Sequence, residues 1–436
     1  MLKKNVLRVK KGIKLLRNEG FSVFAKKLSW WVQVRLKMVD PLERELTASD
    51  LFYTFEPSLE PISYYKVNRQ QPRVNIVTDR LNQSCFFGGV ATSLIVATLF
   101  ANKEGIPLRI ITRDISTPSN YSFFLNLMKI PRPAHVEFFS DYDRSLASYS
   151  RKLDVSEKDI FIATSWWSAK VIKAMNLRDS FFYLFQEMEK FFYPHGDAQF
   201  LCDNVLNDPQ IHYILNSKLL SDYYINNNPP QLLNKRSVFE PAFPKHLYFA
   251  KTSPLEKKKH KLFFYSRPSN PRNLFSVGLQ LLDEAIKRNI LKPEEWEIHL
   301  AGSDEIPEFT FSTGIKPKNL GVMPWSKYLE FIKDVDLGLS LMYSPHPSYP
   351  PLDIAACGGV VLTNKYANKQ ELSYSKNIIC VDLDLDSLIQ GFERAVALAK
   401  NKNLRHQNYL ENTLHIDWNT ALEHTLNFMA QQTPNT

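Results

Sequence analysis

The chain has 436 residues, of which 44% are hydrophobic and 23% charged, and its formal net charge is +9 at pH 7. This composition is typical of a globular protein, and the length suffices for two or three domains with full cores. Its four cysteines are widely separated, which argues against a zinc site or a disulfide framework and favours a reducing, cytoplasmic compartment. No apolar stretch approaches the roughly 20 residues that a membrane-spanning helix needs.

The N-terminal segment carries almost all of the charge excess. Residues 1–37 hold eleven basic residues and one acidic residue, so the rest of the chain is close to neutral. Apolar residues in this segment recur at helical spacing with lysines opposite, which predicts a basic amphipathic helical arm over residues 1–40. We expect the arm to bind an anionic membrane surface, on the inner face of the cell membrane. The alternative is that its helices pack on the protein's own body. No nucleic-acid-binding motif accompanies the basic residues.

A first α/β region is predicted between residues 41 and 245. Residues 38–72 contain four prolines and are expected to form an irregular connection. Short apolar runs then alternate with polar or helical stretches, at 74–77, 108–112, 135–139, 160–163 and 182–185, with an apolar helix at 89–101. This alternation predicts a doubly wound parallel sheet. Residues 225–257 are rich in Asn, Pro and Lys, which indicates the last turns of this domain and a linker.

A second α/β region is predicted between residues 255 and 410. Apolar runs fall at 262–265, 296–301, 337–341, 360–363 and 378–381, with helices beginning at Leu274, Trp325 and Leu385. We therefore expect two Rossmann-like doubly wound domains, with ligand-binding groups at the carboxyl ends of their strands. A stripe of apolar residues at helical spacing predicts a last helix within residues 411–436.

The most informative segment is the loop of residues 344–359, which reads Ser-Pro-His-Pro-Ser-Tyr-Pro-Pro-Leu-Asp-Ile-Ala-Ala-Cys-Gly-Gly. It lies between two apolar runs that predict buried strands. Pro350 and Pro351 suit the first turn of a helix, and Gly358 and Gly359 suit its end. A strand, a polar loop and a helix N-terminus in this order favour binding of a phosphorylated ligand. The alternative is a rigid loop without a ligand.

Three further segments at strand-to-helix junctions are candidates for ligand contacts. Gly88 and Gly89 would let a ligand approach the backbone closely, and a plain tight turn is the alternative. Trp166 and Trp167 cannot both enter one core, so one of them is expected to stack on a sugar or ring, with packing against the next helix as the alternative. Glu189 follows an apolar strand and is a candidate for proton transfer or for positioning a hydroxyl.

Arg267 and Arg272 lie between a predicted strand and a helix start in the same block as the 344–359 loop. Two guanidinium groups at this place predict a clamp for a diphosphate, because arginine makes planar, bidentate contacts to phosphate oxygens. Two exposed loop arginines are the alternative. The acidic run of residues 382–386 is interpreted as the cap of a helix, and no metal site is assigned to it.

These motifs carry a resemblance to a known family. The two arginines, and residues 350–358 followed by Val360-Val361, resemble the donor half of family 4 glycosyltransferases. The run of residues 344–352 is similar to the WsaF-type rhamnosyltransferases of bacterial surface glycans. The segments around Gly88, Trp166 and Glu189 are similar to the same group, and the likeness covers residues 73–430.

The resemblance implies a GT-B fold whose C-terminal domain binds a nucleotide sugar, whose N-terminal domain binds the acceptor, and whose last helix crosses back to the first domain. It implies retaining, metal-independent transfer of a sugar, with dTDP-L-rhamnose or a similar molecule as donor, onto a glycan or lipid-linked acceptor. No cofactor is expected.

The resemblance also implies roles for individual residues. Arg267 and Arg272 would neutralise the leaving diphosphate, and Asp353 would hold the ribose. The remaining donor-side residues would be Gly88, Gly89, His346, Ser348 and Tyr349, with Trp166, Trp167 and Glu189 on the acceptor side.

The chain departs from the family pattern at three positions. Pro345 stands where the broader family has a glutamate that contacts the transferred sugar, so His346 or backbone groups must substitute for it. Asp353 replaces a longer glutamate, and Met323 stands near the position of a lysine. These departures keep open a second function, a non-catalytic GT-B module that scaffolds a membrane-bound glycan assembly complex. A dinucleotide-dependent oxidoreductase is not supported, because no Gly-x-Gly-x-x-Gly follows the first strand.

Overall fold

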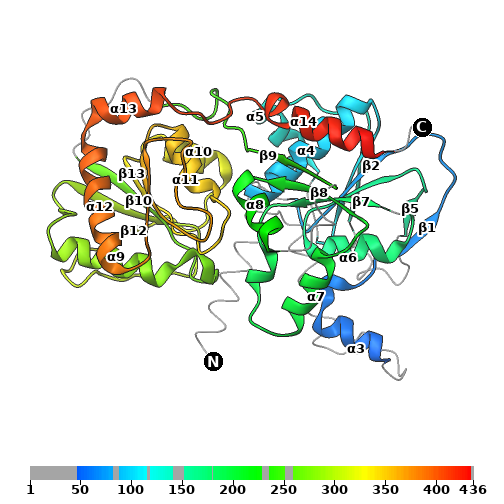
Figure 1. Cartoon of the computed structure of the whole chain (residues 1–436), viewed down its shortest axis with the longest axis horizontal. Coiled ribbons are helices and arrows are strands. Elements are labelled where there is room, and N and C mark those ends of the chain that lie inside the picture. The colour runs from blue at the N-terminus through cyan, green and yellow to red at the C-terminus, as the bar shows by residue number, and fades with distance from the viewer. Residues whose placement is uncertain are drawn as a thin grey trace. The chain divides into compact units, whose positions relative to one another are not determined.

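The computed structural model describes residues 47–81, 88–114, 118–140, 152–178, 180–227, 235–250 and 259–433 (Figure 1). The predicted basic arm lies outside these residues, so the arm and its membrane contact stay predictions. Within the described residues, no helix is both long enough and apolar enough to cross a membrane. Two parallel sheets flanked by helices confirm the predicted α/β class.

The first sheet has seven strands in the order β4-β3-β2-β6-β7-β8-β9. Their bounds are β2 Val74–Thr78, β3 Leu108–Thr112, β4 Val136–Ser140, β6 Ile160–Ala163, β7 Phe181–Phe185, β8 Ile211–Asn216 and β9 Arg236–Phe239. The helices of this part are α4 Gly88–Glu104, α5 Ser119–Met128, α6 Trp166–Met175, α7 Asp197–Leu206 and α8 Lys218–Asn226. Strands β2, β3, β6, β7 and β8 are buried along their whole length. Burial on both faces explains why these strands are mostly apolar.

The second sheet has six parallel strands in the order β12-β11-β10-β13-β14-β15. Their bounds are β10 His260–Tyr265, β11 Trp296–Ala301, β12 Lys318–Asn319, β13 Leu337–Leu339, β14 Val360–Asn364 and β15 Ile378–Val381. The chain builds outward from β10 on one side and then returns to add β13 on the other. The carboxyl ends of β10 and β13 are therefore the topological switch point, where open α/β sheets bind ligands.

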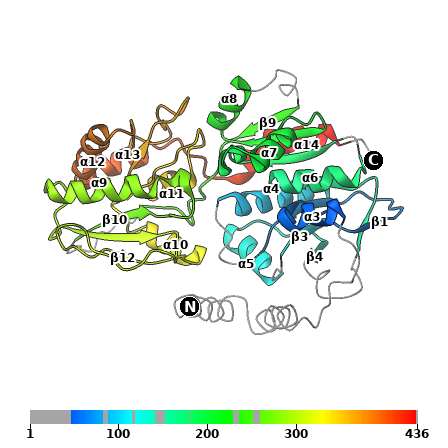
Figure 2. The same ribbon diagram turned by 90° about the horizontal axis from the view of Figure 1, so that it is seen from below.

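Helices cover both faces of the second sheet. The helices are α9 Phe275–Lys287, α10 Trp325–Ile332, α11 Tyr349–Ala356, α12 Leu385–Lys400 and α13 Lys402–Leu410. Figure 2 shows α9 and α12 on one face and α10 on the other. Asp384 caps α12 through its side chain, which confirms the interpretation of the acidic run as a cap.

Some elements were not anticipated. Helix α3 (Ala48–Phe55) and strand β1 (Tyr64–Lys66) lie in the segment that was expected to be irregular. Strand β1 pairs with β5 (Leu153–Val155). Helix α3 begins with a capping box between Thr47 and Asp50, a signal present in the sequence. Strand β9 lies in the segment that was expected to hold the last turns of the first domain and a linker, so a strand was not anticipated there. Its alternating burial is the pattern of an edge strand in a polar context.

By its internal contacts the chain divides into two compact units. Of the described residues, the first unit comprises 47–81, 97–114, 118–140, 152–178 and 180–182, and the second comprises 88–96, 183–227, 235–250 and 259–433. The division therefore falls within α4 and β7 rather than in the linker between the sheets. In the second unit, the last helix, α14 (Trp418–Gln432), packs on β9, where Ser237 Oγ and Thr425 Oγ1 are hydrogen-bonded at 3.0 Å.

A buried ion cluster joins the amino ends of β2, β3 and β6 in the first unit. The Arg73 side chain, 1% exposed, lies 3.0 Å from Asp159 Oδ2 and 2.7 Å from Glu137 Oε2. Arg109 donates to Asp154 Oδ1 at 2.8 Å. Burial lowers the pKa of Arg109 to about 10, which Asp154 and Asp159 partly offset. Because these strands are parallel, their amino ends meet at one edge, opposite to the edge that binds ligands in such folds.

We predict that Asp159→Asn lowers the free energy of unfolding by about 3–5 kcal/mol, because it removes a fully buried carboxylate that faces the guanidinium groups of both Arg73 and Arg109. Urea unfolding followed by circular dichroism measures the change. Glu157→Gln is the matched control, since Glu157 pairs with Lys66 at the surface with its side chain 74% exposed and its loss should cost less than about 1 kcal/mol. Equal effects of the two substitutions would contradict a structural role for the cluster.

Candidate functional site

The candidate site is built from the segments that follow β10 and β13. Residues 266–273 follow β10 and contain Arg267 and Arg272, and residues 340–348 follow β13 and lead into α11. Asn364, at the end of β14, fixes the second segment by accepting from Met342 N at 2.7 Å and donating to Met342 O at 3.1 Å. These loops are therefore pinned to the sheet edge at which the chain switches direction.

Arg272 is a buried cation with unused hydrogen-bonding capacity. Its backbone oxygen accepts from Tyr343 N at 2.7 Å, and its guanidinium lies over the Phe192 ring, 3.8 Å from the centroid. Its Nε lies 3.9 Å from Glu187 Oε2. Burial lowers the pKa of Arg272, and Glu187 offsets part of this shift. Among the described residues, neither Nε nor Nη1 of Arg272 has a hydrogen-bond partner, although both atoms are buried. Two N–H groups are therefore available to an anion.

Glu187 is the carboxylate that faces this arginine. The residue is 8% exposed, and its Oε1 accepts from the Ser344 hydroxyl and from Met188 N. It thereby joins the segment after β7 to the loop after β13. The sequence pattern singled out Glu189 instead. Glu189 is also buried, and its Oε1 accepts from Tyr183 Oη at 2.7 Å, so its assignment to the acceptor stays a prediction.

His346 supplies a second unused donor. Its Nδ1 accepts from Ser348 N at 3.0 Å, so in the neutral ring the proton is on Nε2. Burial lowers the pKa of His346 to about 4, so the ring is neutral at physiological pH. Its Nε2 is buried and has no partner within the described part of the chain. The imidazole is thus positioned to donate one hydrogen bond to a ligand oxygen.

Lys369 is a site residue that the sequence did not reveal. It is fully buried, and its Nζ donates to Met342 O at 3.0 Å and to His346 O at 3.5 Å. Burial lowers its pKa to about 8, and nearby Cys380 and Glu187 oppose that shift. The surrounding sequence, Asn-Lys-Tyr-Ala-Asn-Lys-Gln, is polar and looks like an ordinary surface turn. Only the fold places this ammonium group beneath the His346 loop.

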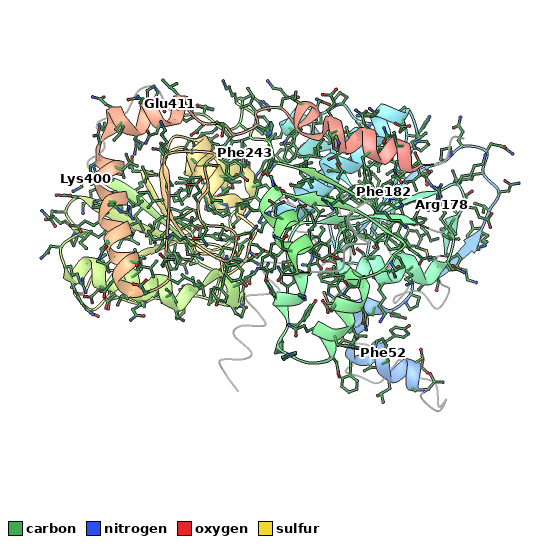
Figure 3. All side chains as sticks on the ribbon, viewed as in Figure 1. Phe52, Arg178, Phe182, Phe243, Lys400 and Glu411 are labelled. Carbon is green, nitrogen blue, oxygen red and sulfur yellow. The ribbon has the colours of Figure 1, made fainter. Side chains whose placement is uncertain are left out.

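The N-terminus of α11 is held by Tyr349. Its Oη is hydrogen-bonded to Thr92 Oγ1 at 2.5 Å and to Asn216 Nδ2 at 2.8 Å. Its ring lies 6.5 Å from that of Phe243, which is labelled in Figure 3. Gly88 has a positive φ of 46°, and a Cβ there would lie 3.2 Å from the Tyr349 ring. The glycine is thus required both for its backbone conformation and for close packing. Tyr349 supports the site, and a contact of its phenol with the donor stays a prediction.

The remaining donor-side residues lie in the same unit. A Cβ at Gly89 would come within 3.1 Å of the Gln186 side chain, which donates to Gly89 O at 2.8 Å. Ser348 is buried with a positive φ of 68° and precedes α11. Arg267 Nη1 donates to Tyr265 Oη at 3.3 Å. The diphosphate clamp of Arg267 and Arg272 stays a prediction.

Asp353 is buried beneath this surface rather than open at it. Its Oδ2 accepts from Tyr328 Oη at 3.0 Å, and the Tyr248 phenol also hydrogen-bonds to the carboxyl. Burial raises its pKa from 3.8 to about 7, against the opposing effect of these two bonds. The carboxyl therefore links α11 to α10 and to the segment containing Tyr248. Its expected contact with a ribose stays a prediction.

The two tryptophans belong to the first unit. Trp166 is 1% exposed and forms part of the core, whereas Trp167 is partly exposed and donates from Nε1 to Asp79 Oδ1 at 2.8 Å. Their rings meet edge to face, 6.1 Å apart. The inference that both could not enter one core is confirmed. A buried ring offers no face to a sugar, so the prediction that Trp166 contacts an acceptor is wrong, and the acceptor contact of Trp167 stays a prediction.

Two doubly wound parallel sheets are the architecture of GT-B glycosyltransferases, and solved structures of that class are similar to this chain. HepE of Anabaena, in complex with UDP and glucose, is 13% identical with a TM-score of 0.55, over 82% of this chain and 98% of that one. A TarM mutant of S. aureus, in complex with Fondaparinux, alpha-GlcNAc-glycerol and UDP, is 9% identical with a TM-score of 0.56, over 82% and 99%. At these identities the likeness shows the fold alone.

Sequence comparison identifies the family. Models of the N-terminal and C-terminal domains of WsaF match residues 73–218 and 260–393. The chain therefore belongs to the WsaF family of GT-B glycosyltransferases. Over 269 residues, 62% of this chain, it is 26% identical to the O-antigen biosynthesis protein RfbC of Myxococcus xanthus, and the match spans 20% of that protein's length.

The buried Asp353 carboxyl predicts a pH-dependent stability. Because the pKa of the carboxyl is about 7 in the folded protein, against its ordinary value of 3.8, unfolding releases a proton at pH values between the two. Its contribution is fully present below about pH 4 and is lost as the pH rises to 7, at up to about 1.4 kcal/mol per pH unit. We expect Asp353→Asn to remove this slope, as measured by urea unfolding from pH 4 to 8.

Nucleotide binding by the same variant tests the role that the resemblance implies. If Asp353 acts only through Tyr248 and Tyr328, the affinity for dTDP should change less than about threefold, or under 1 kcal/mol. A loss of tenfold or more would instead support a direct contact with the ribose. A stability profile that keeps the slope of the parent protein would contradict the assigned pKa of the carboxyl.

Proposed function

We propose that the protein is a nucleotide-sugar-dependent glycosyltransferase whose donor diphosphate binds between Arg272 and His346. The observation that carries the proposal is a set of buried donors without partners in the described residues, Nε and Nη1 of Arg272 and Nε2 of His346. These groups lie in the loops at the switch point of the second sheet. Desolvated N–H donors around a cation are suited to an oxyanion, and a diphosphate satisfies several of them at once.

The balance of buried charge supports the same ligand. Arg272 and Lys369 bring two cations to this place, Glu187 brings one carboxylate, and His346 is neutral. An unpaired buried cation is costly, and an anionic ligand would relieve that cost. Lys369 also offers a replacement for the lysine that this chain lacks near Met323, although it arrives from a different loop.

The chemistry of transfer needs little more from the protein. An acceptor hydroxyl attacks the anomeric carbon on the face that the diphosphate leaves. The bond from the anomeric carbon to the diphosphate oxygen breaks, and its electron pair remains on the diphosphate. A diphosphate oxygen takes the proton of the acceptor hydroxyl. Arg272, aided by Arg267 and the His346 donor, stabilises the charge that develops on the leaving group.

The donor sugar and the pathway follow from resemblance and comparison. We propose L-rhamnose carried on dTDP as the donor, with retention at the anomeric carbon, and a glycan of a surface polysaccharide as the acceptor. The family match supports a glycosyltransferase and the similarity to the O-antigen biosynthesis protein supports a polysaccharide acceptor, whereas the rhamnose donor and retention rest on the resemblance of residues 344–352. UDP-glucose is the comparison donor, because HepE was solved with UDP and glucose.

We predict that dTDP-L-rhamnose raises the melting temperature of the parent protein in a concentration-dependent manner. Arg272→Ala should weaken binding about 10- to 100-fold, since it removes charge-assisted hydrogen bonds worth roughly 1.5–3 kcal/mol. Arg288→Ala is the control, because Arg288 pairs with Glu284 on the exposed face of α9. Equal affinities of the two variants would contradict the assigned diphosphate site.

An assay of sugar transfer distinguishes an active glycosyltransferase from a non-catalytic scaffold. Release of dTDP in the presence of an acceptor, with the anomeric configuration of the product read by NMR, would establish the activity. A second candidate function, a non-catalytic scaffold, is favoured by one observation: buried Pro345 occupies the position of the family's sugar-binding glutamate. Tight nucleotide binding without release of dTDP would identify that function.

The lowered pKa of Lys369 leads us to expect that donor binding depends on pH. Because its pKa is about 8 in the free protein, the ammonium is charged below that value and neutral above it. We therefore expect the affinity for dTDP to fall as the pH rises above 8. Lys369→Met should bind more weakly at pH 7 and lose this decline, as measured by calorimetric titration from pH 7 to 9.5.

The control for this prediction is Lys365→Met. Lys365 lies in the same connection and pairs with Asp382 at the surface. Its removal should leave both the affinity and the pH profile close to those of the parent. If the parent shows no decline above pH 8, or if both variants show the same decline, the charge of Lys369 does not act on the ligand.

A further inference from the structure

A cluster of aromatic side chains borders the Arg272 site on one side. Tyr343 and Tyr366 meet edge to face with their ring centroids 4.7 Å apart. Tyr366 also lies 6.3 Å from Tyr223 and 6.5 Å from Phe191. Tyr343 follows β13 and Tyr366 follows β14, whereas Tyr223 follows β8 and Phe191 follows β7. Four connections of the second unit therefore converge here. We call this set the aromatic cluster.

The aromatic cluster is continuous with the proposed diphosphate site. Tyr343 N donates to the backbone oxygen of Arg272, and Phe192, next to Phe191, lies against the Arg272 guanidinium. Burial raises the pKa of Tyr366 to about 12, and the neighbouring Tyr223, then Tyr343 and Glu187, add to this shift. The aromatic cluster and the Arg272 site are therefore joined through the Tyr343 backbone and through the Phe191-Phe192 pair.

The chemistry of the aromatic cluster indicates what binds there. Three of its four members are tyrosines, and the phenols of Tyr366 and Tyr223 are hydrogen-bonded to each other. Tyr343 is 52% exposed, so about half of its side chain is accessible to a ligand. A ring face with phenol groups beside it matches a pyranose, which has an apolar face of C–H bonds and a rim of hydroxyls. A lipid chain would gain nothing from the phenols.

We propose that the aromatic cluster is the binding site for the acceptor sugar, with Tyr343 as the ring on which the sugar stacks. This inference rests on the proposed transferase function, because only a transferase requires an acceptor beside the diphosphate. It places the acceptor hydroxyl next to the bond that breaks. Tyr366 and Tyr223 then form hydrogen bonds with sugar hydroxyls and set which sugars fit.

The experiment uses three methyl glycosides as probes: methyl α-L-rhamnoside, methyl α-D-glucoside and methyl α-D-mannoside. Saturation-transfer NMR on the full chain with dTDP present detects which of them bind. We expect at least one to bind to the parent protein and to lose affinity about three- to tenfold in Tyr343→Ala, as removal of an aromatic stack implies. Tyr343→Phe should retain most of the binding.

Tyr65→Ala is the matched control, because Tyr65 is an equally exposed tyrosine, 51% against 52%, on strand β1 of the other unit. It should bind the glycosides as the parent does. The affinity for dTDP, measured on the same samples, should be unchanged in Tyr343→Ala, which also shows that the variant is folded.

Three results would overturn the inference. They are binding of glycosides that is unaffected by Tyr343→Ala, binding of none of the three probes while dTDP binds, and a loss of dTDP affinity in Tyr343→Ala. The last would assign the aromatic cluster to the nucleobase of the donor. Failure of the proposed function looks different, since the parent protein would then bind no nucleotide or nucleotide sugar at all.

Discussion

One buried carboxylate organises the candidate site. Glu187 follows β7, accepts from Ser344 after β13, and faces Arg272 after β10. Three loops that are distant in sequence are thus joined by one charge inside the second unit. Without Glu187, the Arg272 guanidinium would be a buried cation against an aromatic ring, and such a charge is unfavourable unless it is paired. With it, the arginine is held in place while two of its N–H groups remain available, which is the combination that recognition of an anion requires.

Around this carboxylate, some residues support the site and others have donors available to a ligand. Tyr349 and Asp353 lie in the loop-helix motif that resembles the donor site, yet both are tied to neighbouring elements, Tyr349 through Thr92 and Asn216 and Asp353 through tyrosine phenols. They fix the position of α11. His346 and Arg272 keep unpaired buried donors. A motif therefore contains two kinds of residue that look alike in sequence, and only their hydrogen bonds distinguish them.

Much of the fold could be predicted from the sequence. The buried parallel strands are mostly apolar runs, and the Pro-Pro start and Gly-Gly end of α11 fall as expected, with Gly358 at φ 78°. Strand β9 could not be predicted, because an edge strand in a stretch rich in asparagine and proline lacks an apolar run. Lys369 could not be read either, since a buried lysine in a polar turn has no local signature. The sequence did not distinguish Glu187 from Glu189, because the fold of this segment and of the η4 turn (Glu189–Phe192) decides which carboxylate faces Arg272.

The sequence by itself determined the α/β class, the strand-loop-helix motif, the positions of its arginines and the resemblance to the family, because apolar periodicity, proline and glycine act locally. The tertiary structure decided which charges meet. It placed Glu187 and Lys369 beside the Arg272 and His346 loops, and it gathered four aromatic residues from four connections into one cluster. Burial and long-range contact have no local signal in the chain, so these features exist only once the second sheet and its loops are assembled.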